Sequence, residues 1–170
     1  GKGPQRSGCT LCGGCMVGCR YNAKNTLDKN YLYLAEKKGV TISSEKEVLY
    51  VQKKDNGYTL KYRKSTGLLK KTDKVHAKKV IFSGGVMGSV KLLLKCKDKG
   101  YLSKLSDSLG DYVRTNSESI LGVRSKIAHK TKDFTKGVAI SAGFMADEKT
   151  HIETCRYGVG QNSMSLLTTH

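Results

Sequence analysis

An apolar run that ends in a glycine turn and continues as a helix restricts the fold of this chain most. The run Val80-Ile81-Phe82-Ser83 has the character of a buried strand, and Gly84-Gly85-Val86-Met87-Gly88-Ser89 follows it at once. Apolar residues at positions 90 and 92–94 then predict a helix. In a strand–turn–helix unit the backbone N–H groups at the helix start can face a phosphate. The turn alone also fits a plain packing connection, because it lacks the G-x-G-x-x-G of a complete dinucleotide fold.

The residues before this turn predict one helix and several short strands. Apolar residues from Leu27 to Ala35 fall at helical spacing, and Gly39 ends the run. The segment Asp55-Asn56-Gly57 has the composition of a tight hairpin turn. The strands expected in this part cover residues 40–42, 47–53, 58–64, 68–72 and 75–83.

The residues after Asn116 alternate in the manner of antiparallel strands, whereas residues 98–115 have the composition of loops and turns. The strands expected here cover residues 120–127, 137–145, 151–157 and 163–167. The sequence therefore predicts a mixed α+β chain, in which a hairpin-bearing α/β part extends to about Arg114 and an antiparallel sheet follows it.

The chain is strongly basic, since 31 lysines and arginines against 14 acidic residues give a formal charge of +17. Such a charge favours nucleic acids, anionic membranes or anionic cofactors. The lysines lie in scattered pairs such as Lys53-Lys54 and Lys78-Lys79, without interleaved aromatic residues. We therefore expect a solvated lysine-rich surface and no nucleic-acid partner. No apolar run approaches the length of a membrane span, so the sequence predicts no transmembrane segment.

Both ends of the sequence have the character of cuts within a longer protein. The chain starts at Gly1 rather than at a methionine, and it stops inside an apolar stretch, residues 163–170. Natural domains usually end in polar, frayed residues. The sequence is therefore expected to be an internal piece of a larger protein.

Four of the six cysteines lie within the first nineteen residues, at the spacing Cys9-x2-Cys12-x2-Cys15-x3-Cys19. Such clustering favours a reducing compartment, and hence a cytoplasmic location, over a secreted disulfide framework. The spacing matches the iron–sulfur run of bacterial ferredoxins, although Arg20 stands where that run has proline. Zinc is a second interpretation, and a cysteine-rich loop with free thiols is a third.

Two longer stretches carry a joint pattern that is more specific than any of these motifs. Residues 22–51 read NAKNTLDKNYLYLAEKKGVTISSEKEVLYV, and residues 75–119 read VHAKKVIFSGGVMGSVKLLLKCKDKGYLSKLSDSLGDYVRTNSES. Together they resemble the middle of cholesterol-oxidase-like members of the glucose–methanol–choline family of FAD-dependent alcohol oxidoreductases. Gly84 stands where that family usually has alanine, and Ser103 where it has proline. The resemblance extends from residue 9 to about residue 167.

The resemblance implies roles for individual residues. Val48 resembles the valine whose backbone holds the FAD adenine. Gly85 resembles the glycine that lets the chain approach the nucleotide, and Gly84 belongs to the same turn. Asn116 lies near the point where the chain crosses to the flavin and the substrate domain begins. Glu153 resembles the carboxylate that acts as base or electrostatic partner in steroid-oxidising relatives, although an exposed strand carboxylate is the competing interpretation.

The resemblance also implies a division of the chain. Residues 1–24 are a cysteine- and glycine-rich loop, residues 25–115 are part of an FAD-binding domain with a β-meander, and residues 116–170 are part of an antiparallel substrate-binding sheet. Cys155-Arg156 stand where apolar residues are usual. A nearby arginine would keep the Glu153 carboxylate charged.

The function that the resemblance implies is oxidation of an alcohol, which could be sterol-like, by hydride transfer to FAD. Electrons would leave to oxygen in an oxidase or through an iron–sulfur cluster to a redox partner in a dehydrogenase. The family's N-terminal glycine motif and its C-terminal His and Asn are absent from the sequence, so this piece alone is expected to be inactive. The four histidines have no matching context: His76, His129, His151 and His170.

Two other interpretations of the function remain open at this point. In the first, the cysteine run carries the function, and the chain is an iron–sulfur electron-transfer or metal-binding module. In the second, the chain is a basic nucleic-acid-binding domain with a zinc loop.

Overall fold

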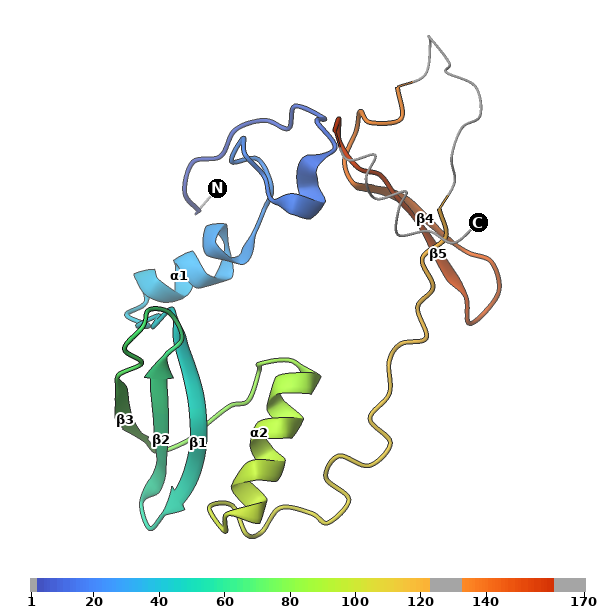
Figure 1. Ribbon diagram of the computed structural model, residues 1–170. Helices are drawn as coiled ribbons and strands as arrows, with labels where there is room; N and C mark the ends of the chain where they lie inside the picture. Colours follow the sequence, from blue (N-terminus) through green and yellow to red (C-terminus); the bar gives the residue numbers. More distant parts are fainter. Residues whose placement is uncertain (1–2, 123–132, 161–170) are drawn as a thin grey trace. The chain divides into compact units, whose positions relative to one another are not determined.

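The computed structural model describes residues 3–122 and 133–160 of the chain (Figure 1). The chain divides into two compact units. The first, here called the cysteine unit, comprises Gly1–Thr41 and Ser119–His170, and the second, here called the meander unit, comprises Ile42–Glu118. Helical segments and antiparallel strands occur in both units, so the expected mixed α+β character is confirmed. No helix in the described ranges is long and apolar enough to cross a membrane.

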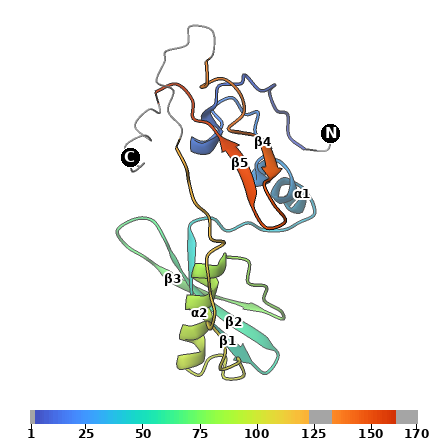
Figure 2. The ribbon, with the colours of Figure 1, turned by 90° about the vertical axis from the view of Figure 1, so that its right-hand side faces the viewer.

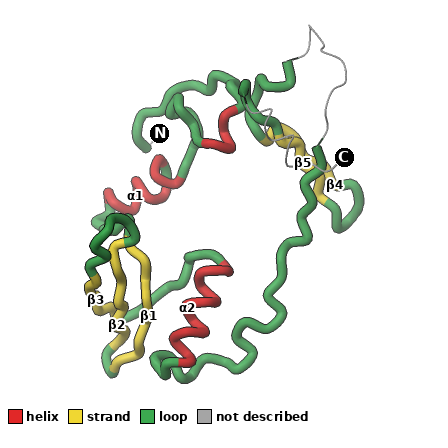
Figure 3. The backbone as a smooth tube through the Cα atoms, viewed as in Figure 1, coloured by secondary structure: helices red, strands yellow, loops and turns green. Residues whose placement is uncertain are grey.

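The meander unit is built on a three-stranded antiparallel sheet with the order β1-β2-β3 (Figure 3). Its strands are β1 (Lys46–Lys54), β2 (Gly57–Lys64) and β3 (Thr72–Ala77). The expected hairpin turn is confirmed, because Lys54 pairs with Gly57 across it. Gly57 has a φ of 140°, and a Cβ atom there would lie 2.4 Å from the carbonyl oxygen of Ala77. Only glycine fits this corner of the sheet.

Helix α2 (Val86–Asp98) and the turn after it pair with the outer edge of β1. The Val51 N–H donates to the Sγ atom of Cys96 at 3.3 Å, and the Lys53 N–H donates to the Tyr101 carbonyl at 3.0 Å. Val51 and Cys96 are only 1% and 0% exposed. The Tyr50 and Tyr101 rings lie with their centroids 4.7 Å apart. This contact closes the β1 edge, which would otherwise present free backbone groups.

Replacing Cys96 by alanine is expected to destabilise the meander unit. The change removes the acceptor of a buried N–H group, which costs about 1–3 kcal/mol. The measurement is the free energy of unfolding in urea, compared with that of Cys155→Ala, because Cys155 is exposed. Equal unfolding midpoints for the two variants would show that the Val51–Cys96 contact contributes nothing.

The cysteine unit holds short helices and one hairpin. The helical segments are η1 (Gly14–Val17), η2 (Leu27–Lys29) and α1 (Tyr31–Lys37). The strands β4 (Ile140–Met145) and β5 (His151–Cys155) pair in antiparallel fashion (Figure 2). The Thr150 carbonyl accepts from the Ala146 N–H at 2.9 Å and closes the turn between them.

The predicted helix of residues 26–38 is confirmed in its second half and differs in its first half. Residues 27–29 form a separate 3-10 turn, and Asn30, with φ −133° and ψ −100°, interrupts the helix before α1. The predicted strand 40–42 is wrong. Gly39 has a φ of 87°, and the Val40 N–H turns back to donate to the Ala35 carbonyl at 3.1 Å. That hydrogen bond closes the helix end and uses the donor that a strand would need.

Two predicted strands around β3 are also displaced. Residues 68–71 are outside the sheet, since β3 begins only at Thr72. The apolar run 80–83 does not form a strand, and Ile81 is 88% exposed. A strand requires a hydrogen-bonding neighbour, and the sheets of the described residues offer none to this run.

The strands predicted after Asn116 are confirmed only where they pair with each other. The predicted strand 137–145 begins at Ile140, and its first residue, Gly137, makes an isolated bridge instead. The predicted strand 151–157 ends at Cys155. Residues 120–122 are not in a strand, whereas residues 123–127 and the predicted strand 163–167 lie outside the described residues.

Candidate functional site

The four clustered cysteines lie on a loop that is held against the residues before β4. The Gly13 N–H donates to the Gly137 carbonyl at 2.9 Å, and the Gly137 N–H donates to the Leu11 carbonyl at 2.7 Å. Gly13 has a φ of 71°, and a Cβ atom there would lie 2.4 Å from the Thr135 carbonyl oxygen. At Gly13 the cysteine loop therefore lies so close to the backbone of Thr135 that only glycine fits there.

The cysteine loop surrounds a cavity of about 360 Å³. Its lining includes all four cysteines of the loop, together with Lys24 and the residues from Gly137 to Ile140. All six cysteines of the chain are free thiols. Within the described residues, no group of three or more His, Cys, Asp or Glu side chains is arranged to hold a metal ion. The iron–sulfur interpretation thus gains no support, and the metal-binding role of Cys9, Cys12, Cys15 and Cys19 stays a prediction.

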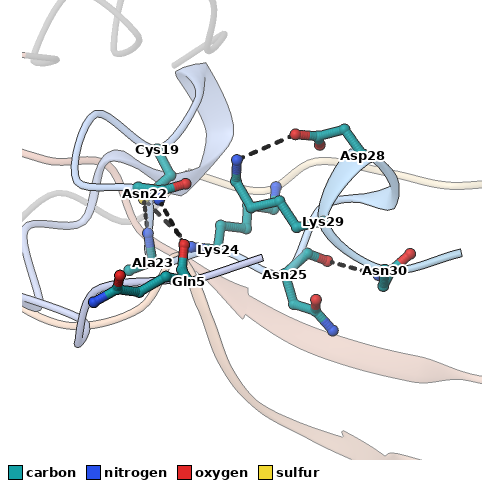
Figure 4. Close-up of polar contacts among 9 residues, drawn as sticks. All are labelled: Gln5, Cys19, Asn22, Ala23, Lys24, Asn25, Asp28, Lys29 and Asn30. Carbon is teal, nitrogen blue, oxygen red and sulfur yellow. Dashed lines mark hydrogen bonds and ion pairs between the residues drawn. The ribbon is translucent and has the colours of Figure 1, made fainter. Parts of the chain in front are cut away.

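Cys19 has an environment that favours a negative charge on sulfur (Figure 4). Its Sγ atom accepts the N–H groups of Ala23 at 3.3 Å and of Lys24 at 3.4 Å. The Lys24 and Ala23 N–H groups are the largest reasons that the pKa of the Cys19 thiol lies below its ordinary value. A further backbone N–H, that of Tyr21, and the charge of Lys24 act in the same direction.

The loop that delivers these donors is fixed by a side-chain hydrogen bond. Asn22 has a φ of 55°, a conformation that asparagine tolerates better than most residues. Its Nδ2 group donates to the Gln5 carbonyl at 3.1 Å (Figure 4). This bond ties the segment after Cys19 to the residues before the first cysteine.

The glycine turn before α2 leads into a helix as the sequence predicts, whereas the strand expected before the turn does not form. Gly85 is the N-cap residue, with φ 75° and ψ 161°, and no side chain caps the helix. The first helical hydrogen bond runs from the Ser89 N–H to the Gly85 carbonyl at 3.0 Å. A Cβ atom on Gly85 or Gly88 would have no neighbour within 4 Å. No side chain of the N-cap residue therefore binds the first N–H groups of α2, and the space beside Gly85 and Gly88 is open.

Val48 and Asn116 belong to the same unit as this turn. Val48 lies on β1, is 37% exposed, and stands beside a register shift between Val48 and Tyr50. The Asn116 Nδ2 group donates to the Glu118 carboxylate at 3.0 Å. The residue between them, Ser117, has a φ of 57°.

Glu153 lies on β5 in the cysteine unit, opposite Gly143 of β4, and is exposed. It lies beside His151 of the same strand, whose Nδ1 atom is 3.7 Å from Oε1 of Glu153. The Arg156 guanidinium lies beside Gly137 and donates to the Lys136 carbonyl and to the Ser141 hydroxyl, so the ion pairs of the described residues do not include one between Arg156 and Glu153.

The histidines differ in their surroundings. His76 lies on β3, and its Nδ1 atom is 2.9 Å from the hydroxyl of Thr59, which is buried. His151 accompanies Glu153 on β5. His129 and His170 lie outside the described residues.

The structure thus brings the four cysteines around one cavity and places Val48, Gly84, Gly85 and Asn116 in one unit. Sequence reasoning missed Lys24, whose backbone N–H binds the Cys19 sulfur, and Cys96, which closes the β1 edge. The only signal for Lys24 was its place five residues after the last cysteine of the run. Cys96 had no signal, because a single cysteine in a helix looks like any small apolar residue.

Comparison with known proteins assigns the chain to a family. Residues 4–97 match the GMC oxidoreductase family. The chain is 45% identical over 177 aligned positions to a cholesterol oxidase of Acinetobacter baumannii, an alignment that covers 100% of this chain and 32% of that protein. It is 42% identical over 171 positions to the cholesterol oxidases of two Mycobacterium tuberculosis strains, with 99% of this chain and 30% of those proteins covered.

The chain spans about a third of the length of these relatives. No solved structure gave a significant match. The family match and the whole-chain identity agree with the resemblance carried by residues 22–51 and 75–119. The chain belongs to the GMC oxidoreductase family.

Proposed function

We propose that this chain is part of a flavoprotein that oxidises an alcohol, with a sterol as the first substrate to test. The observation that carries the proposal is the identity of 45% to a cholesterol oxidase over the whole chain. FAD, when bound, supplies a flavin ring that accepts a hydride from the carbinol carbon. Molecular oxygen is the electron acceptor that we propose, and a protein redox partner is the competing one.

The residues before α2 fit the nucleotide part of FAD. A helix N-terminus carries partial positive charge and unpaired N–H groups, which favour an anionic phosphate. The open space in front of Gly85 and Gly88 leaves room for a ligand to approach the backbone. We assign Gly84 and Gly85 to the nucleotide and the backbone of Val48 to the adenine. The formal charge of +17 favours the same anionic cofactor.

We propose that residues 25–115 contribute to the FAD-binding domain and residues 116–170 to the substrate-binding sheet, with Asn116 at the junction. Residues 1–24 are then an accessory loop. The antiparallel pairing of β4 with β5 supports a sheet after the junction.

We assign Glu153 to the proton chemistry of the substrate. An exposed carboxylate on a strand can take a proton at Oε1 or balance a developing positive charge. His151, with Nδ1 at 3.7 Å from that oxygen, is the next group along a proton path. Glu153 therefore acts as the base or as an electrostatic partner.

Replacing Glu153 by glutamine is expected to lower kcat for alcohol oxidation by about 10²–10⁴-fold, the usual contribution of a positioned acid or base. The matched control is Glu148→Gln, because Glu148 is an exposed residue in the turn between β4 and β5. Turnover of both variants is followed in the full-length natural protein through hydrogen peroxide release. An unchanged kcat and an unchanged pH profile in the Glu153→Gln enzyme would exclude a role for Glu153 in the mechanism.

The alcohol itself is tested by mixing the full-length protein with candidate substrates in the absence of oxygen. A 3β-hydroxysteroid is expected to bleach the flavin absorbance, and added oxygen is expected to restore it. Simple primary alcohols are the control that shows whether the enzyme requires a bulky substrate. Failure of every sterol and simple alcohol to bleach the flavin would contradict the proposed function.

A further inference from the structure

The cysteine cavity has chemistry that alcohol oxidation does not use. Four free thiols line one space of about 360 Å³ in the cysteine unit. Cys9 and Cys12 are exposed, whereas Cys15 and Cys19 are half-buried. Small reagents can therefore reach the cavity, and several thiols are available as partners once one of them reacts.

Cys19 is the thiol best prepared to react. The thiolate, not the thiol, is the nucleophile, and positive or N–H-rich surroundings favour it. Two backbone N–H groups point at the Cys19 sulfur, at 3.3 and 3.4 Å.

Cys15 is the partner that we assign to Cys19, because both line the same cavity and both contact Lys24. Lys24 contacts both residues, since its backbone N–H donates to the Cys19 sulfur and its Nζ donates to the Cys15 carbonyl at 3.2 Å. Only three residues separate the two cysteines, and one of them is Gly18, with a φ of 104°. A Cβ atom on Gly18 would meet nothing within 4 Å, so no other group is packed on this side of the residue.

We propose that Cys19 and Cys15 form a reversible disulfide when the protein meets hydrogen peroxide. The Cys19 thiolate attacks one oxygen of the peroxide, the O–O bond breaks, and sulfenic acid and hydroxide form. The Cys15 thiol then attacks that sulfur, an S–S bond forms, and water leaves. The two sulfurs together lose two electrons, which reduce the peroxide. A small thiol reverses the change by thiol–disulfide exchange.

The disulfide is tested on the full-length natural protein by mass spectrometry after limited treatment with hydrogen peroxide. One disulfide, the loss of two hydrogen atoms, is expected in the Cys9→Ser/Cys12→Ser double variant. The Cys15→Ser/Cys19→Ser double variant is the matched control and is expected to form none. In the triple variant Cys9→Ser/Cys12→Ser/Cys15→Ser, which removes every other thiol of the cavity, Cys19 is expected to accumulate as sulfenic acid, which a dimedone probe labels. Dithiothreitol is expected to restore the free thiols.

Cys155 supplies the reference rate, because it is exposed and lies outside the cavity lining. Cys19 is expected to react at least about tenfold faster than Cys155, as a thiolate-stabilising environment implies. Equal rates would overturn the proposal, and so would a disulfide that forms without Cys19. The protein could also bind iron or zinc in stoichiometric amount, with the four thiols unreactive until a chelator removes the metal. That result would overturn the proposal in favour of a metal site. These outcomes do not depend on whether flavin is present.

Discussion

Replacing Gly85 by alanine is expected to remove most of the FAD from the full-length protein. Gly85 has φ 75° and ψ 161°, a region that is almost restricted to glycine, and an alanine held there costs about 1–3 kcal/mol. The turn would relax toward an ordinary conformation and carry the first N–H groups of α2 away from their present direction. The measurement is the ratio of flavin absorbance to protein after gel filtration.

Gly84→Ala is the matched control for this change. Gly84 has no positive φ, and a Cβ atom there would meet only the Ser89 hydroxyl at 3.6 Å, an ordinary contact distance. That variant is expected to keep its flavin, in agreement with the alanine that the family usually has at this position. Unfolding midpoints for both variants separate loss of cofactor from loss of structure. Full flavin content in a folded Gly85→Ala protein would contradict the assignment of the turn to the nucleotide.

Replacing Gly57 by alanine is expected to cause the largest loss of stability in the meander unit. The φ of 140° costs about 1–3 kcal/mol for a residue with a side chain. The new Cβ atom would also lie 2.4 Å from the Ala77 carbonyl oxygen, and overpacking of this kind typically costs about 1–3 kcal/mol more. The free energy of unfolding in urea measures the sum.

Gly67→Ala isolates the steric part of that cost. Gly67 also has a positive φ, 84°, but a Cβ atom there would meet nothing within 4 Å. It is therefore expected to lose stability through backbone strain alone, and less than Gly57→Ala. A Gly67→Ala protein that is as unstable as Gly57→Ala would show that the contact with Ala77 is not important.

Local signals in the sequence predicted the elements that depend on neighbours in the chain. The hairpin at residues 55–57 and the helix after Gly85 formed as expected, because turn residues and helical periodicity act over a few positions. The helix end at Gly39 followed for the same reason. The effect of this helix end on Val40 was not predicted, because residues 40–42 were expected to form a strand from their composition of β-branched residues.

Strands that depend on distant partners could not be predicted in this way. The run 80–83 has the composition of a buried strand, yet pairing decides whether a strand forms, and its exposed Ile81 has no sheet neighbour in the described part of the chain. The bridge between Cys12 and Gly137 joins residues far apart in sequence, and no local pattern announces it.

The candidate site follows the same division. The spacing of the four cysteines indicated that their thiols lie close to one another, and in the structure all four line one cavity. The N–H groups that bind Cys19 depend on the fold of residues 21–24, and the partners of Arg156 depend on how it fills the space beside Gly137. Side-chain chemistry was therefore visible in the sequence, whereas the groups that tune it required the structure.

The most direct test of the proposed function is the visible absorption spectrum of the full-length protein purified without oxygen, with flavin and iron quantified. We expect about one FAD per protein chain, the stoichiometry of a single flavin site, and no stoichiometric iron. Flavin together with iron and sulfide would make Cys9, Cys12, Cys15 and Cys19 cluster ligands and contradict the thiol chemistry proposed for them. A protein that is folded and contains no flavin would contradict the central claim that this chain belongs to a working FAD-dependent alcohol oxidoreductase.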